Sequence, residues 1–439
     1  MRAATEGASG RFLFVGKPLR YLCPDGILDQ KRNNMSVFVI NAGSTSLKFG
    51  LFDNVTLEPC VTGEIDWVKG DRQKALLVCR PRDGAPEHTR VPVPNDRAAA
   101  ACALRAVVAH SSSASPITLV GHRVVHGGTN FRGSVVIDSK VKAAIAQLED
   151  LAPLHNPAAL RGIEEAETAL PGVPQVAVFD TAFYSNLPPG ACVYPLPYEW
   201  HKEWGIRRFG FHGLSHAYCA SRAAQLMGKE PAQLRIVSCH LGGGCSATAV
   251  RGGVAVATTM GFSPLDGLMM GTRPGSIDPG ILMYVQRRHR LTLDELDRAL
   301  NYSSGLLGVS GVSADLARIE EAAAQGNERA QLAFEMFADR VRSAVGALAT
   351  TLGGLDALVF ADRIGEHSPL LRKSVCEGLE FMGLRLDRAR NLNAPADSDI
   401  ATADSKARIF VVHTQEELMV AREALCVVRG GQGASSPSN

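Results

Sequence analysis

Two segments of the chain share an uncommon plan: an apolar strand, a tight turn of small residues and a second strand. The first is SVFVINAGSTSLKFGLFD at 36–53, and the second is RIVSCHLGGGCSATAVRGG at 235–253. Glycine-rich turns of this kind let main-chain N–H groups approach an anion closely. Either segment alone is typical of an ordinary β-hairpin. The pair, with one segment opening each half of the chain, instead predicts a duplicated domain that holds a phosphate between its halves.

Strands alternate with helices along the rest of the chain, which predicts an α/β architecture. The expected strands each end in a polar or glycine-rich loop and cover residues 36–40, 117–120, 175–179, 235–239 and 357–361. Loops at the carboxyl ends of such strands are where α/β proteins bind their ligands. Functional residues are therefore expected directly after these strands.

Several helices have recognisable starts. Asn156 and Pro157 predict a cap followed by a proline at the first helical position. Thr292 and Glu295 form a capping-box pattern, and Asn327 opens a long helix that ends at a glycine pair.

The composition is that of a large, nearly neutral globular protein. Of 439 residues, 46% are hydrophobic, so a sizeable core can be buried. Lys and Arg number 46 and Asp and Glu 44, and this net charge of +2 gives no electrostatic basis for binding nucleic acid or a membrane surface. No apolar stretch approaches the ~20 residues that span a bilayer. Ten cysteines, none in a CxxC pair, favour reduced thiols in a cytoplasmic enzyme.

The two ends of the chain differ from the middle. Residues 1–34 contain only a five-residue apolar run, at 12–16, which is too short for the core of a signal peptide. Met35 opens directly onto the first strand. We expect residues 1–34 to be a non-native or disordered extension, with a targeting sequence as the alternative, and residues 432–439 to be a disordered tail.

Four segments carry the chemistry-bearing side chains. They are GHRVVHGG with Arg123, VFD with Asp180, RRFGFHGLSH with His212 and His216, and GTRPGSIDPG with Arg273. Each alone has a structural explanation, such as a solvated arginine or a capping carboxylate. Together, two arginines suit a small carboxylate or a transferring phosphoryl group, because guanidinium binds both in a bidentate manner and stays charged. A carboxylate and an imidazole beside them could position a metal and bind developing charge.

Sequence motifs of other enzyme classes are missing. The chain has no HExxH, no GxSxG with a partnered histidine and no GxxxxGK[ST]. Phosphoryl transfer without a P-loop therefore remains.

Eight segments, in this order along the chain, form a recognisable set: INAGSTSLK, GHRVVHGG, LAPLHNP, VFDTAFY, RRFGFHGLSH, HLGGG, MGFSPLDGLMMGTRPGSIDPG and IGEHS. In these segments the chain resembles the acetate kinase family. The resemblance implies the sugar-kinase/actin/heat-shock-ATPase fold, with two duplicated actin-like domains and a central cleft. One domain would be 35–183 with a returning helix at 418–431, and the other 184–417. It further implies a cytoplasmic homodimer that reversibly transfers the γ-phosphoryl of ATP to acetate, with Mg²⁺ (Mn²⁺ is possible), giving acetyl phosphate and ADP.

The resemblance also assigns roles to residues on the acetate side. Arg123 and Arg273 would hold the carboxylate and the phosphoryl group, and His212 would donate a hydrogen bond to that group. Asp180 would orient metal and nucleophile, since acetate is ionised near neutral pH and needs no general base. The magnesium positions correspond to Asn41 and Glu416, the latter just before the last helix. The residues matching the pocket for the acetate methyl are Val125, Leu154, Phe211 and Pro264. Such a pocket separates acids by only ~1–3 kcal/mol per methylene, so some use of propionate is expected.

The nucleotide side departs from the family pattern. Residues expected near the nucleotide are Lys48, His240, Leu241, Gly242, Gly243, Gly244, Asp315, Ala317, Arg363, Ile364, Gly365, Glu366 and His367. FADRIGEH at 360–367 stands where the family has FTAGIGEN or FTGGIGEN. Arg363 replaces a glycine whose positive φ we expect an arginine not to adopt readily, and Asp362 adds a negative charge. Gly243 stands where Asn or Ser is usual, and Ala317 where a D-x-R motif has its arginine.

Two kinds of function stay open. The first is a working acetate kinase with weakened or shifted nucleotide binding. The alternatives are a weakly active or inactive relative that binds acetyl phosphate or a protein partner, and a kinase with another phosphoryl donor or short-chain acid such as propionate. A chaperone-type or filament-forming ATPase is disfavoured, because the chain has no surplus length for a peptide-binding domain.

Overall fold

A computed structural model describes residues 35–43, 46–67, 71–110, 116–153 and 155–430. The expectations for residues 1–34, Leu154 and 432–439 lie outside the described residues. Among the described residues, no helix is long and apolar enough to cross a membrane.

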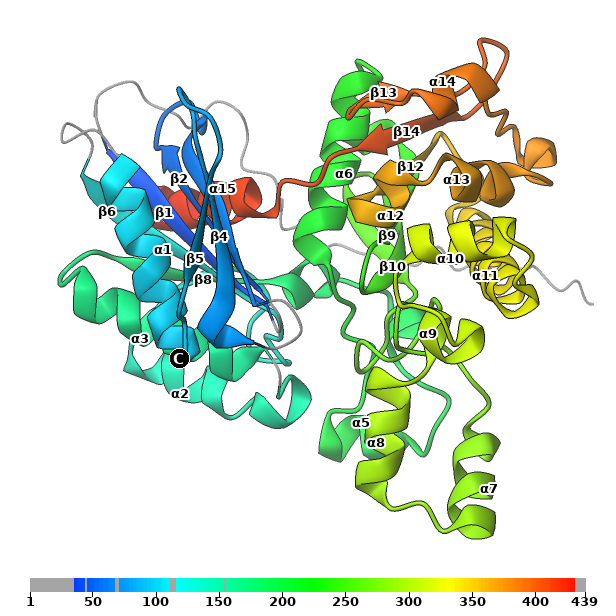
Figure 1. Cartoon of the computed structure of the whole chain (residues 1–439), viewed down its shortest axis with the longest axis horizontal. Helices are drawn as coiled ribbons and strands as arrows, with labels where there is room; N and C mark the ends of the chain where they lie inside the picture. Colours follow the sequence, from blue (N-terminus) through cyan, green and yellow to red (C-terminus); the bar gives the residue numbers. More distant parts are fainter. Residues whose placement is uncertain (1–34, 44–45, 68–70, 111–115, 154, 431–439) are drawn as a thin grey trace, which may run out of the picture.

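Two β-sheets organise the chain into two lobes (Figure 1). The strands of the first lobe are β1 (Ser36–Ala42), β2 (Ser46–Asp53), β3 (Pro59–Asp66), β4 (Ala75–Pro81), β5 (Glu87–Val91), β6 (Ile117–Val124), β7 (Val135–Val136) and β8 (Gln175–Phe179). Those of the second lobe are β9 (Arg235–Leu241), β10 (Cys245–Arg251), β11 (Val254–Thr258), β12 (Ala357–Ala361), β13 (Ser398–Asp399) and β14 (Arg408–Val412). The eight-stranded sheet has the order β5-β4-β3-β2-β1-β6-β8-β7, and the six-stranded sheet has the order β11-β10-β9-β12-β14-β13.

The two sheets contain the same five-stranded unit. In the first lobe β3, β2 and β1 are antiparallel neighbours, and β1, β6 and β8 are parallel neighbours. In the second lobe β11, β10 and β9 repeat the antiparallel part, and β9, β12 and β14 repeat the parallel part. The duplication that the two strand–turn–strand segments predict is confirmed. Three of the five expected strands, β1, β6 and β9, run two to four residues further than expected, because their parallel ladders continue to the edge where the site lies.

Helices cover both faces of each sheet. Those of the first lobe are α1 (Asp96–His110), α2 (Ser139–Ala146), α3 (Asn156–Ala169) and α15 (Glu416–Gly430). Those of the second lobe are α4 (Pro189–Cys192), α5 (Tyr198–Trp204), α6 (Gly213–Leu226), α7 (Pro279–His289), α8 (Leu293–Tyr302), α9 (Gly305–Ser310), α10 (Leu316–Ala324), α11 (Glu328–Leu352), α12 (Asp362–His367), α13 (Pro369–Cys376) and α14 (Arg388–Leu392). A short 3₁₀ helix at Asp180–Tyr184 follows β8.

Two of these helices join the lobes. The last helix, α15, returns to pack on β1, β6 and β8 of the first sheet, where its red ribbon lies among the blue strands in Figure 1. On the second sheet, α6 packs on β9, β12 and β14, and it also contacts α15. One buried apolar cluster runs through both sheets and both helices, from Val39 through Ala421 and Ala220 to Val359. This core brings the carboxyl ends of both sets of parallel strands to one region.

Local signals at the helix starts were mostly reliable. Thr292 and Glu295 form the full capping box of α8, and Asn327 caps α11, which ends at Gly353 in the left-handed conformation. The cap predicted at Asn156 is wrong: α3 begins at Asn156, with His155 in the cap position. The Asn156 side chain is turned inward, where it accepts from the backbone N–H of His126 at 3.2 Å and donates to its carbonyl at 3.0 Å.

Candidate active site

The carboxyl ends of the parallel strands in the first lobe bring three polar side chains together. Asn41 of β1 is paired in register with Arg123 of β6, and Asp180 directly follows β8. The Arg123 guanidinium donates to both carboxylate oxygens of Asp180, at 3.1 Å from Nε and 2.6 Å from Nη2, and to the Asn41 side-chain oxygen at 3.0 Å. The Asp180 side chain is 1% exposed and that of Arg123 13%. The arginine is therefore fixed by a bidentate pair, with its position set by three strands.

The start of α15 adds two carboxylates from the far end of the chain. Asn41 Nδ2 donates to Glu416 at 3.2 Å and to Glu417 at 2.8 Å, and Glu416 lies 3.8 Å from Arg123 Nε. Glu416 was expected just before the last helix, but it is the first residue of that helix.

The charges in this cluster shift each other's pKa. Burial alone would raise the pKa of Glu416, but the positive charges of Arg123, His240 and Lys48 lower it to about 2. Burial raises the pKa of Asp180, with Arg123 opposing that effect. Burial would lower the pKa of Lys48, but the carboxylates of Glu417 and Glu416 outweigh it and raise the value. Lys48 therefore lies in the field of the acidic pair and stays cationic.

Three histidines of the second lobe are held by serine hydroxyls. His212 Nδ1 lies 2.9 Å from Ser246 Oγ, and the same hydroxyl lies 2.8 Å from His216 Nε2. His216 Nδ1 also contacts Ser238 Oγ at 3.0 Å. Burial, together with the charges of neighbouring histidines, lowers the pKa of both His212 and His216 well below the usual value. Both imidazoles are therefore neutral near pH 7.

His240 connects this group to the loop after β12. Its Nδ1 lies 2.8 Å from Ser215 Oγ, and its Nε2 lies 3.3 Å from the carboxylate of Asp362. The ring centroids of His240 and His212 are 4.1 Å apart. The register explains the grouping, because His240 of β9 is paired with both Ser246 of β10 and Ala361 of β12.

Arg273 approaches the same region from a loop of the second lobe. Its Nη1 donates to the Pro264 carbonyl at 2.8 Å. A Cβ at Gly244 would lie 2.9 Å from Arg273 Nη2 and 3.4 Å from His212 Nε2, so both side chains converge over that glycine. Burial and the charges of Arg123 and Arg273 together lower the pKa of His155 to about 4. The two predicted arginines thus act on shared neighbours, one from each lobe.

The described residues predicted for the methyl pocket are Val125, Phe211 and Pro264. Val125 and Phe211 are 8% and 2% exposed and belong to one buried apolar cluster, and the Pro264 carbonyl accepts from Arg273. Leu154, the fourth predicted residue, lies outside the described residues.

The nucleotide-side residues form a second group around the turn between β9 and β10. Leu241 and Gly242 are buried, and Gly243 is exposed. Asp315 caps α10 by accepting from the backbone N–H of Ala317 at 3.2 Å, and its carboxylate is paired with Arg363 at 2.9 Å. The remaining predicted residues, Ile364, Gly365, Glu366 and His367, lie in α12.

The expectation about the backbone at Arg363 is wrong. The left-handed conformation falls on Asp362, with a φ of 62°, and Arg363 is absent from the described residues with positive φ. The physical reason is that α12 begins at Asp362, so the residue in the left-handed conformation is the first of the helix and Arg363 already lies within it. The Arg363 side chain, 67% exposed, points to Asp315.

Sequence reasoning missed several supporting residues. The sequence did contain a signal for the serines that hold the histidines. Ser238 and His240 are two apart and so share one face of a strand, and His212 and His216 are four apart at the start of a helix. Buried Arg372 had none: its guanidinium donates to the carbonyls of Gly365 and Glu366 at 2.8 and 2.7 Å and so fixes the end of α12.

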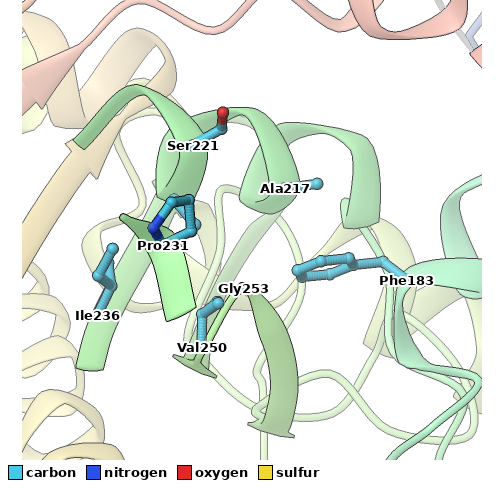
Figure 2. Close-up of a pocket in the computed structure, with 8 residues that line it drawn as sticks. Phe183, Ala217, Ser221, Pro231, Ile236, Val250 and Gly253 are labelled. Carbon is cyan, nitrogen blue, oxygen red and sulfur yellow. The ribbon is translucent and has the colours of Figure 1, made fainter. Parts of the chain in front are cut away.

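A small cavity elsewhere does not have the properties of a ligand site. It lies between α6 and the strands β9 and β10, as Figure 2 shows, and is lined mainly by apolar side chains such as Phe183, Ile236 and Val250. Its volume of about 10 Å³ is that of one water molecule at most.

The residues present fit a divalent cation that is held jointly with phosphate. In the described part of the chain, no three His, Cys, Asp or Glu side chains are grouped so as to hold a metal alone. Mg²⁺ usually takes one or two carboxylates and fills its other positions with substrate phosphates and water. Glu416, ionised and beside Asn41, supplies such a carboxylate.

Comparison with known proteins gives a consistent result. The family model described as "Acetokinase family" matches residues 36–422. The chain is 49% identical over 400 residues to an acetate kinase of Trichormus variabilis, covering 89% of this chain and 98% of that protein. The crystal structure of Porphyromonas gingivalis acetate kinase matches with a TM-score of 0.80 and 37% identity, over 90% of this chain and 100% of the other. A propionate kinase from Francisella tularensis matches with a TM-score of 0.81 and 36% identity, over 89% and 98%. The chain therefore belongs to the acetokinase family.

Proposed function

We propose that the protein is an acetate kinase that transfers the γ-phosphoryl group of ATP to acetate, reversibly, to give acetyl phosphate and ADP. The observation that carries this proposal is that the two arginines come from different lobes to one region. Arg123 is held by buried Asp180, Arg273 and His212 converge over Gly244, and Gly213, next to His212, packs against the Asp180 carbonyl. Guanidinium groups match both the carboxylate of the acceptor and the oxygens of a phosphoryl group.

In this mechanism the residues position and neutralise rather than exchange protons. An acetate oxygen attacks the γ-phosphorus in line, a new O–P bond forms, and the bond to the bridging oxygen breaks with its electron pair leaving on ADP. Arg123 and Arg273 hold acetate and the phosphoryl oxygens, which gain charge in the transition state. Neutral His212 donates a hydrogen bond to the same oxygens, and Asp180 keeps Arg123 in place.

The metal and nucleotide are assigned to the adjoining residues. Glu416 with Asn41 would hold Mg²⁺ (or Mn²⁺), which when bound neutralises phosphate charge. Lys48, His240 and the turn at 242–244 would approach the phosphates, supported by the cationic state of Lys48 and the small residues of the turn. Val125 and Phe211 would receive the methyl group of acetate. A pocket of this kind also admits propionate at reduced efficiency.

A direct assay tests the proposal. Purified full-length protein with acetate, Mg²⁺ and ATP should form acetyl phosphate, which hydroxylamine traps as a hydroxamate. Asp180→Asn is the inactive control. No turnover with any nucleoside triphosphate or with pyrophosphate would refute the proposal and favour a relative that only binds acetyl phosphate or a partner.

A homodimer is proposed as the working form. Large apolar side chains are exposed on α5, α7 and α8, which lie together at the lower end of the second lobe in Figure 1. Trp204 is 64% exposed, Tyr284 61% and Leu293 74%. An exposed apolar patch of this kind is typical of a subunit interface. Light scattering should give twice the chain mass, and Trp204→Asp with Tyr284→Asp should give monomers. A cytoplasmic location is also proposed, since the cysteines that the structure describes form no disulfide bonds with one another.

A further inference from the structure

The loop after β12 places a carboxylate against the proposed phosphate-binding turn. A Cβ at Gly242 would collide with the Asp362 carboxylate, so the glycine leaves room for that side chain in its present position. The same carboxylate lies 3.3 Å from His240 Nε2, and its charge helps to raise the pKa of Lys48. Asp362 therefore contacts or influences the groups that are proposed to receive the donor phosphates.

The backbone holds Asp362 in this place at a cost. Its φ of 62° is a left-handed conformation that an aspartate adopts less readily than glycine. The next residue, Arg363, is paired with Asp315 at 2.9 Å, which ties the first turn of α12 to the start of α10. The Gly365 and Glu366 carbonyls at the other end of α12 are fixed by Arg372. The position of Asp362 is therefore determined from both sides.

We propose that Asp362 is an internal competitor of the donor phosphate: its carboxylate occupies the anion position beside Gly242 and His240, and a nucleotide must displace it. This inference rests on the proposed function and names a residue that determines nucleotide affinity. The phosphates of a metal-free nucleotide carry their full negative charge and are repelled by this carboxylate. A nucleotide that carries Mg²⁺ has less net negative charge and is repelled less. Nucleotide binding should therefore depend on the divalent cation more steeply than in a chain without this carboxylate.

Two substitutions separate charge from backbone strain. Asp362→Asn keeps the size of the side chain and tolerates a positive φ, but it removes the charge. Asp362→Gly removes both the charge and the strain. Calorimetry with ADP and ATP, each with and without Mg²⁺, should show affinity raised about fivefold or more in both variants, as expected for one partly exposed charge. The gain should be larger without Mg²⁺.

Asp397 provides a matched control. It is an aspartate with a φ of 60° whose carboxylate pairs with Arg222 at 3.0 Å, on a different part of the second lobe. Asp397→Asn should leave nucleotide affinity unchanged. If Asp362→Asn binds ADP and ATP no more tightly than the wild type, or more weakly, then Asp362 does not compete with phosphate and the inference is overturned.

A failure of the Asp362 inference can be distinguished from a failure of the proposed function. If the wild-type protein forms no acetyl phosphate while Asp362→Asn still tightens nucleotide binding, the competition stands and the catalytic proposal fails. If the wild-type protein forms acetyl phosphate and Asp362→Asn leaves the affinity unchanged, the activity stands and the competition fails. In both variants the KM for acetate should stay the same, because Arg123 and Arg273 hold that substrate.

Discussion

Arg123 and Asp180 form a bidentate ion pair, at 2.6 and 3.1 Å, at the carboxyl ends of two neighbouring parallel strands. Val124 and Phe179, the residues next to them, are partners in the register of β6 and β8. Because the pair is almost fully buried, the carboxylate is stabilised mainly by this one arginine. The arginine thus has two tasks that can be separated: it opposes the effect of burial, which raises the pKa of Asp180, and it presents a fixed cation to the substrate.

Removing Arg123 or Arg273 should reduce catalysis, but only the removal of Arg123 should strongly lower the free energy of unfolding. Arg123→Ala and Arg273→Ala should each lower kcat/KM by an amount equivalent to about 3–4 kcal/mol. Arg123→Ala should also lower the free energy of unfolding by about 3 kcal/mol, because it leaves buried Asp180 unpaired. Arg273 has a carbonyl partner, so its removal should cost less. Steady-state kinetics and urea unfolding measure the two effects, and an unchanged kcat/KM in either variant would contradict the assigned roles.

A double variant checks the origin of the stability loss. Arg123→Met with Asp180→Leu replaces the buried pair by apolar groups and should recover most of the unfolding free energy without restoring activity. If it is no more stable than Arg123→Ala, the unpaired carboxylate is not the cause.

His212 should act as a neutral hydrogen-bond donor. Its pKa lies well below the usual value because of burial and neighbouring positive charge, so it stays uncharged as pH rises from 6 upward. Protonation of His212 should therefore cause no fall in kcat near pH 6.5. The wild type and His212→Asn should have pH profiles of the same shape in that range. His212→Ala should lower kcat by about 10²-fold, and His212→Asn, which retains a donor, by less. A His212-dependent limb near pH 6.5 would instead indicate a charged imidazole.

The duplicated core, and the grouping of polar side chains near the ends of its parallel strands, could be predicted because both are encoded locally. The strand–turn–strand segments and the positions directly after strands carried Arg123, Asp180 and His240, and the structure brings them to one region. Residue patterns alone could not predict the long-range contacts. Asn41 and Glu416 are hydrogen-bonded across 375 positions of the chain, and only the family resemblance assigned them to one site.

The errors have a common physical origin. Asn156 has the sequence signature of a cap, but tertiary hydrogen bonds to the His126 backbone take its side chain instead. The strained residue is Asp362 and not Arg363, because the start of α12 is set by how β12 ends against β9. Neither outcome is visible in residue spacing.

Glu423 should make stability depend on pH. Burial raises the pKa of this α15 carboxyl to about 7, with the hydroxyl of Ser134 opposing at 3.3 Å. The folded state keeps the proton up to about pH 7, whereas the unfolded chain loses it near pH 4.5. Between those values the folded state binds more protons, so stability falls as pH rises, by up to about 3 kcal/mol.

A substitution isolates this carboxyl. Glu423→Gln should match the wild type in unfolding free energy near pH 5 and exceed it at pH 8, as measured by urea denaturation at both values. A difference between the two proteins that does not change with pH would contradict the prediction.

Arg363→Gly should tighten ATP binding without changing the KM for acetate, because it removes a long side chain from the nucleotide side and breaks the ion pair with Asp315 that ties the first turn of α12, and with it Asp362, to α10. The Arg363–Asp315 pair is largely exposed, so its loss should cost less than about 1 kcal/mol of stability. Arg385, paired with Asp404 at 2.8 Å and similarly exposed, gives the control: Arg385→Gly should leave ATP binding unchanged. Arg363→Ala separates the loss of the side chain from added backbone freedom. If ATP affinity falls in Arg363→Gly and Arg363→Ala alike, the guanidinium is itself a phosphate ligand that this chain has in place of the usual glycine.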